Sequence, residues 1–173
     1  MTDWKQIAES DHAVPQDRDV AELTAELSAA LAHPDPKIRD GAPYGVLYRW
    51  ISRGVLDDHL PALGDAMAAR FGHAEIQART FAPLVLAWVV DRRGAEERWV
   101  DAFASWYPAE TDLRGHDPEL GWLHAVAHGA DLLGVFGATR PAGCWTWPPA
   151  GWSRRPSTSG ATRRTTGWRT PSR

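Results

Sequence analysis

Apolar residues recur at intervals of three and four along almost the whole chain before residue 137, and this spacing constrains the fold more than any other feature. It places apolar side chains on one face of an α-helix, whereas the alternation typical of β-strands is scarce. The sequence therefore predicts an all-α fold. The helical segments that we expect are marked by residues 20–31, 38–51, 56–71, 76–90, 95–107 and 117–136.

Capping residues indicate where two of these helices begin. Asp35-Pro36 and Asp117-Pro118 each combine an N-cap carboxylate with a proline at the first helical position, where the missing N–H costs nothing. We therefore expect a helix to start at each place. The segment 76–90 is apolar on most sides, which predicts a central, buried helix.

Short connections between the segments favour antiparallel packing of neighbouring helices. Taken in pairs, the segments recur roughly every 40 residues, which is the length of HEAT-like helical repeats that stack into a solenoid. The repeats show little identity with one another, so an irregular bundle is the alternative. The predicted organisation is a helical domain over residues 1–137, followed by an irregular, disordered basic tail over residues 138–173.

The composition indicates a soluble protein with a cytoplasmic location. The longest apolar stretch, Phe81 to Val90, is about half of the roughly 20 residues that a membrane span needs, and the polar N-terminus does not resemble a signal peptide. The single cysteine, Cys144, excludes an internal disulfide and a cysteine-based zinc cluster. All 22 acidic residues precede Gly143, so this acidic part is not expected to bind nucleic acid.

The tail after Gly137 differs from the rest of the chain. It lacks a helical period, is rich in Pro, Gly, Ser, Thr and Arg, and contains four of the ten tryptophans, although disordered tails are usually poor in aromatic residues. Read across codon boundaries, the two steps between Cys144 and Thr146 encode Leu and Asp, whichever synonymous codons are used. We hypothesise that a one-base slip near residues 138–143 replaced native C-terminal helices. A genuine basic extension is the alternative.

Two motifs before the tail resemble a known family. D-L-R-G, residues 112–115, precedes G-W-L-H-A-V-A-H-G-A-D, residues 121–131. Together they resemble the pattern D-L-R-G, G-W-x-H-x-x-A-H-x-A-D of a bacterial family catalogued as domain of unknown function 2785, and D-P-K-I-R-D, residues 35–40, is similar to a helix start in that family. The resemblance covers about residues 20–137. It implies a helical fold and a bacterial source, and it implies no known activity.

The second motif contains the one polar group that could carry chemistry. His124, His128 and Asp131 would share one stripe of a helix, because they are about one and two turns apart. This arrangement could bind zinc or a similar divalent metal and leave positions open for water. The complete candidate polar site comprises Asp112, Arg114, His116, Trp122, His124, His128 and Asp131.

The same residues can instead form a structural network. In that interpretation His128 hydrogen-bonds a backbone carbonyl, and Asp112 or Asp131 holds Arg114, which ties the preceding loop to the helix. The metal signal is weak because Ala125 occupies the place that Glu has in zinc proteases. We therefore expect no cofactor, and a divalent metal is the alternative.

The sequence supports two functions of different classes. The first is a non-catalytic helical-repeat scaffold that binds a protein or peptide partner along a groove, by analogy with open solenoids. The second is a metal-dependent or anion-binding enzyme that uses His124, His128 and Asp131. No phosphate-binding loop, dinucleotide-binding glycine motif or nucleophile elbow is found in the sequence.

Overall fold

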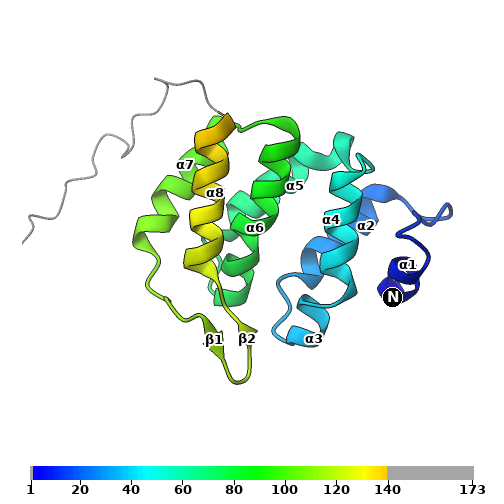
Figure 1. Ribbon diagram of the computed structural model, residues 1–173, viewed down its shortest axis with the longest axis horizontal. Coiled ribbons are helices and arrows are strands. Elements are labelled where there is room, and N and C mark those ends of the chain that lie inside the picture. Colours follow the sequence, from blue (N-terminus) through cyan, green and yellow to red (C-terminus); the bar gives the residue numbers. More distant parts are fainter. Residues whose placement is uncertain (1, 140–173) are drawn as a thin grey trace, which may run out of the picture.

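Helices account for most of the described chain, and one short β-hairpin interrupts them (Figure 1). The computed structural model describes residues 2–139. The helices are α1 (Trp4–Glu9), α2 (Val20–Ala30), α3 (Pro36–Arg39), α4 (Ala42–Ser52), α5 (Leu60–Arg70), α6 (Ile76–Arg93), α7 (Glu97–Trp106) and α8 (Ala125–Thr139). The hairpin strands are β1 (His116–Asp117) and β2 (Gly121–Trp122). The predicted helical class is thus confirmed for the described residues, and the hairpin is an addition to it.

The helices pack in two layers around one hydrophobic core. In one layer α4, α6 and α8 lie side by side, and α6 contacts both neighbours (Figure 1). In the other layer α5 contacts both α2 and α7. Contacts between α2 and α4, between α5 and α6, and between the rings of Phe103 in α7 and Phe136 in α8 join the layers. Each longer helix therefore buries one face against the opposite layer.

The central helix is α6, as its apolar sequence predicts. It contacts α4, α5 and α8, and most of its residues are buried. A helix that is covered on several sides needs apolar side chains around most of its circumference, which explains its composition. Pro83 lies inside α6, and the helix continues through it. Within residues 2–139 no helix combines the length and apolar character needed to cross a membrane.

The segment 38–51, which the sequence predicts as part of one helix kinked by Gly41 and Pro43, contributes to two helices instead. α3 and α4 are separated near Gly41, where an added Cβ would lie 2.6 Å from the carbonyl oxygen of Lys37. Glycine is therefore required by the close approach of the backbone at this break. The predicted cap at Asp35 is confirmed, because its side chain accepts a hydrogen bond from the Lys37 N–H at 2.9 Å.

The prediction that a helix starts after Asp117 is wrong. Asp117 Oδ1 instead accepts hydrogen bonds from the backbone N–H groups of Glu119 and Leu120, each at 2.9 Å, and so closes a turn. Gly121 then has a φ of 74°, which lies outside the helical region. The same capping chemistry therefore produces a hairpin turn here, and α8 begins only after the hairpin.

The starts of α3 and α6 share one local motif, H-x-[DE]-x-x-x-R. In each copy the histidine Nδ1 accepts a hydrogen bond, at 3.0 Å, from the backbone N–H two residues later. The arginine Nη1 donates to the carbonyl oxygens of that histidine and of the next residue. The copies comprise His33, Asp35 and Arg39, and His73, Glu75 and Arg79.

The predicted end of the helical domain at residue 137 falls inside α8, which ends at Thr139. From residue 140 onward, the predicted basic tail and the hypothesis of a frame slip concern residues outside the described part of the chain. Reading codons 137–173 in the source gene tests that hypothesis directly, because a single inserted or deleted base would restore a Leu-containing helical continuation.

Candidate functional site

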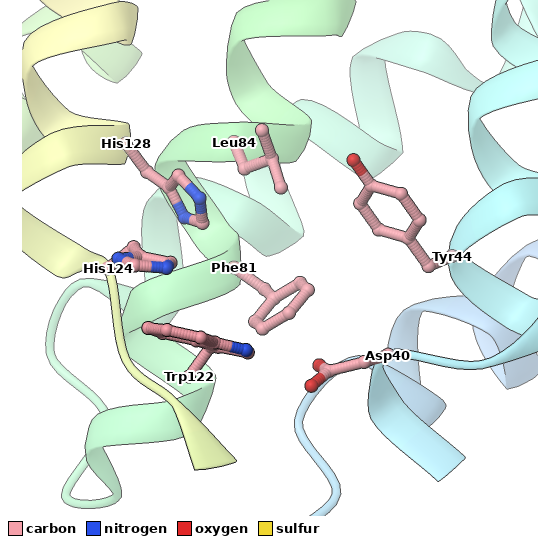
Figure 2. A pocket seen from close by; sticks show the side chains of 7 residues that line it. All are labelled: Asp40, Tyr44, Phe81, Leu84, Trp122, His124 and His128. Carbon is pink, nitrogen blue, oxygen red and sulfur yellow. The ribbon is translucent and has the colours of Figure 1, made fainter. Parts of the chain in front are cut away.

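A cavity opens between the layer formed by α4, α6 and α8 and the residues of the hairpin. Its volume is about 240 Å³, and side chains from several elements point into it (Figure 2). Rings make up most of its lining, and it contains one carboxylate. The lining residues are Asp40, Tyr44, Phe81, Leu84, Trp122, His124 and His128.

The D-L-R-G motif forms the loop that positions the hairpin. Arg114 donates to both carboxylate oxygens of Asp112, at 2.9 and 2.7 Å, and also pairs with Asp117. The Leu123 N–H donates to the Gly115 carbonyl at 2.9 Å. Asp112 thus holds Arg114, as the structural interpretation predicts, and the hydrogen bond from Arg114 lowers the pKa of Asp112. Neither residue lines the cavity.

Three rings of the hairpin and of its junction with α8 contact one another. Antiparallel pairing of β1 and β2 places His116 opposite Trp122, with ring centroids 4.9 Å apart. His124, just before α8, stacks on Trp122 with centroids 5.1 Å apart and an interplanar angle of 15°. Trp122 nevertheless remains 57% exposed. The hairpin therefore presents an indole at the mouth of the cavity.

His128 connects α8 to α6. Its Nδ1 lies 2.9 Å from the carbonyl oxygen of Thr80. Because a carbonyl oxygen only accepts, Nδ1 carries the proton of the neutral ring and Nε2 keeps a lone pair. Burial lowers the pKa of His128, and the bond to Thr80 opposes this shift. The side chain is therefore a neutral hydrogen-bond acceptor beside the cavity, and its backbone contact is the one that the structural interpretation predicts.

Asp40 reaches the cavity from the side opposite Trp122 (Figure 2). Its Oδ1 accepts a hydrogen bond from Nε of Arg39 at 3.0 Å, whereas its Oδ2 accepts none from the described residues. Arg39 is fully buried, donates to backbone carbonyls including that of Leu120, and lies over the ring of Phe81 at 5.5 Å. Arg39 therefore fixes one oxygen of Asp40, and the other oxygen has no donor among the described residues.

The cavity is part of a longer series of rings on the face of α4, α6 and α8, which we call the aromatic row. Neighbouring ring centroids lie 4.9–6.3 Å apart. At the end of the row opposite the hairpin, Tyr48 is 44% exposed and borders a second depression of about 360 Å³. In order, the aromatic row comprises Tyr48, Trp88, Tyr44, Phe81, His128, His124, Trp122 and His116.

A buried ion pair holds the loop before the hairpin against α6. Glu110, whose side chain is 3% exposed, accepts two hydrogen bonds from Arg79 at 2.7 and 3.1 Å. It also accepts from Trp106 Nε1 and from the N–H groups of Thr111 and Asp112. Burial alone would raise the pKa of Glu110, but these hydrogen bonds, with that from Arg79 the strongest, lower it to about 2. Glu110 is therefore a structural group that is charged at neutral pH.

Some residues of the predicted polar site come together and others do not. His124 and His128 line the cavity beside Trp122, with the two imidazole centroids 5.6 Å apart. His124 precedes α8 instead of lying on it, and Asp131 is exposed and does not line the cavity. Among residues 2–139 no group of three or more His, Cys, Asp or Glu side chains is placed to hold a metal. A metal site therefore stays a prediction without geometric support.

Sequence reasoning missed the side of the cavity that α4 and α6 provide. Tyr44 and Phe81 look like ordinary core residues, so nothing in their spacing indicates a cavity. The helix starts did contain a signal that relates His128 to two arginines. Arg39, Arg79 and His128 are each the fourth residue of their helix, α3, α6 and α8 respectively. All three side chains contact backbone carbonyls, and an alignment of the three starts would have related them.

Residues 70–140 match the model of a family described as protein of unknown function (DUF2785). This range is shorter than the resemblance over residues 20–137, and it leaves Asp40 and Tyr44 outside. No curated protein and no solved structure matches the chain. The matched range includes both motifs of the resemblance and the α6, hairpin and α8 sides of the cavity. The comparison therefore supports the resemblance to the DUF2785 family over residues 70–140.

Proposed function

We propose that the chain is a HEAT-like helical-repeat scaffold that binds an extended segment of a protein partner across the aromatic row. The observation that carries the proposal is the row itself. It continues over α4, α6, α8 and the hairpin, and both Tyr48 and Trp122 are exposed. Tyrosine and tryptophan are enriched at protein interfaces, where a few such residues supply most of the binding energy.

Two features support the HEAT-like arrangement. The longer helices form two layers, with α2, α5 and α7 in one and α4, α6 and α8 in the other. The H-x-[DE]-x-x-x-R motif recurs at the starts of α3 and α6, which is expected if equivalent repeats begin there. Stacked repeats of this kind present a continuous surface along one layer, and such surfaces serve as partner-binding faces.

A metal-dependent or anion-binding enzyme that uses His124, His128 and Asp131 has less support. Asp131 is exposed and outside the cavity, and Arg114, the one arginine of the candidate polar site, is held by Asp112 and Asp117. Metal analysis of the purified protein tests this alternative. A stoichiometric divalent metal that is lost in a His128→Ala variant would favour the enzyme and count against the scaffold.

Selection of peptides from a random displayed library against the full chain tests the scaffold. The selected peptides are then measured against the Trp122→Ala and Tyr48→Ala variants. Because interface aromatic residues often contribute more than about 1.4 kcal/mol, we expect binding to weaken by roughly tenfold or more in each variant.

Leu113→Ala is the matched control, because Leu113 is 69% exposed but lies outside the aromatic row. Binding to this variant should equal binding to the wild type. Peptides that bind all three variants as tightly as the wild type would contradict the proposal.

A further inference from the structure

We propose that the cavity holds a basic side chain of the bound partner, arginine in preference to lysine, and that Asp40 is the residue that selects it. This inference rests on the proposed function and names the chemistry of one contact within it. It follows from the hydrogen-bonding groups that line the cavity, from the rings around them and from the charge of the helical part of the chain.

The hydrogen-bonding groups of the cavity favour a donor-rich cation. Asp40 Oδ2 accepts no hydrogen bond from the described residues, and His128 Nε2 keeps a lone pair because Nδ1 is committed to Thr80. A guanidinium offers five N–H donors and no acceptor, so it matches two separated acceptors. Arg39 pairs with Oδ1 of Asp40, but no Lys or Arg side chain lines the cavity itself, so an anion in the cavity would face the carboxylate and no cation of the lining.

The rings of the cavity favour the same class of ligand. Tyr44, Phe81 and Trp122 line it, and aromatic faces attract cations placed within about 6 Å of the ring centroid. Phe81 already has the guanidinium of Arg39 over its ring at 5.5 Å. A planar guanidinium stacks on rings better than an ammonium does, which is why arginine is preferred to lysine.

The charge of the helical part complements a basic partner. All 22 acidic residues of the chain lie at or before Asp131, whereas seven of the 19 Lys and Arg residues lie at or after Arg140. The part that carries the cavity is therefore strongly acidic. Such a surface accelerates encounter with basic segments and disfavours acidic ones.

Three acetylated and amidated pentapeptides test the inference, Gly-Gly-X-Gly-Gly with X as arginine, citrulline or leucine, and a fourth with X as lysine tests the preference for arginine. Citrulline has nearly the shape of arginine but no charge. Binding to the full ¹⁵N-labelled chain is followed at the Trp122 indole N–H, which a Trp122→Phe variant assigns. We expect the arginine peptide to bind about tenfold or more tightly than the citrulline peptide, and a lysine peptide to fall between them.

The Asp40→Asn variant should abolish the difference between arginine and citrulline. Asn keeps an oxygen that can accept from Arg39 Nε, so the fold should persist, which thermal unfolding checks. Asp91→Asn is the matched control, because Asp91 is an exposed carboxylate in the neighbouring depression and should leave the difference unchanged.

The outcomes separate the inference from the proposed function. Equal binding of the three peptides, no response of the Trp122 indole to the arginine peptide, or an unchanged preference in Asp40→Asn would overturn the basic-side-chain inference. If library-selected peptides still lose affinity in Trp122→Ala, the scaffold function would survive that result. If the selected peptides are also insensitive to Trp122→Ala and Tyr48→Ala, both proposals fail.

Discussion

The starts of α3 and α6 share the same arginine contacts to the backbone before the helix, but the two arginines differ in their further partners. In both, an arginine donates to the two carbonyls that precede the helix. Arg39 then reaches Leu120 in the hairpin turn and Asp40, which is one-third exposed. Arg79 reaches Glu110, a buried carboxylate in the loop before the hairpin.

This difference shows how a repeated motif acquires separate roles. Both arginines hold the segment that leads to Trp122, but Arg39 does so mainly through neutral carbonyls and Arg79 through a buried ion pair. Breaking a buried ion pair leaves an uncompensated charge, whereas losing bonds to carbonyls leaves neutral groups unpaired. The loop should therefore depend more strongly on Arg79 than on Arg39.

The largest effect is expected for Arg79, when each of the two arginines is replaced separately by methionine. Methionine roughly preserves the volume of the side chain. Arg79→Met leaves Glu110 without its cation and should cost about 3–5 kcal/mol of unfolding free energy. Arg39→Met leaves backbone carbonyls unpaired and should cost about 1–3 kcal/mol. Urea unfolding of both variants measures the difference, and an equal or larger loss in Arg39→Met would break the comparison.

Acid should reduce the stability that the Arg79–Glu110 ion pair contributes. Because the pKa of Glu110 is lowered from 4.5 to about 2, its contribution is complete above pH 4.5 and is lost as the pH falls toward 2. The shift corresponds to about 3 kcal/mol. Urea unfolding between these pH values should show a loss in the wild type that is much smaller in Glu110→Gln. A parallel decline in both proteins would contradict this assignment.

The contact between Gly129 in α8 and Tyr107, which follows α7, depends on packing. A Cβ on Gly129 would lie 2.2 Å from the ring of Tyr107, whose hydroxyl donates to the Val126 carbonyl. Gly129→Ala should therefore destabilise the fold by about 1–3 kcal/mol. Gly134→Ala is the control on the same helix, because nothing lies within 4 Å of its Cβ. Thermal unfolding should show a small stabilisation for Gly134→Ala, and similar shifts for both variants would exclude the packing argument.

The smallest expected effect concerns His128. Because burial lowers its pKa below the ordinary value, the unfolded chain binds the proton first as the pH falls, and stability declines below about pH 6.5. His128→Asn keeps an N–H donor for the Thr80 carbonyl and removes the titration. Urea unfolding at about pH 7.5 and 5.5 should show a smaller pH dependence in this variant than in the wild type.

His124 and Asp131 act on the charge of His128 from its own side, and Asp40 and Tyr44 face it from across the cavity. His124→Asn is therefore the matched control for the pH experiment. A pH dependence that disappears in His124→Asn and persists in His128→Asn would contradict the assignment to His128.

The sequence by itself determined which of the longer segments are helical. Apolar spacing identified α2, α5, α6 and α7, and the carboxylate of Asp35 marked the start of α3, because these features depend on residues within a turn or two of each other. The resemblance located the segment that contains Trp122, His124 and His128. The chemistry of that segment could not be assigned, because the neighbouring sequence does not show which residues face it across the cavity.

Tertiary structure decided the site. The carboxylate of Asp117 caps a hairpin turn instead of a helix, because the positive φ of Gly121 is not helical. Arg39, which is far from the hairpin in the sequence, holds that turn through the Leu120 carbonyl. The cavity exists because α6 lies between α4 and α8 and places Phe81 beside both Tyr44 and His128. These contacts join residues far apart in the chain, so local patterns carry no information about them.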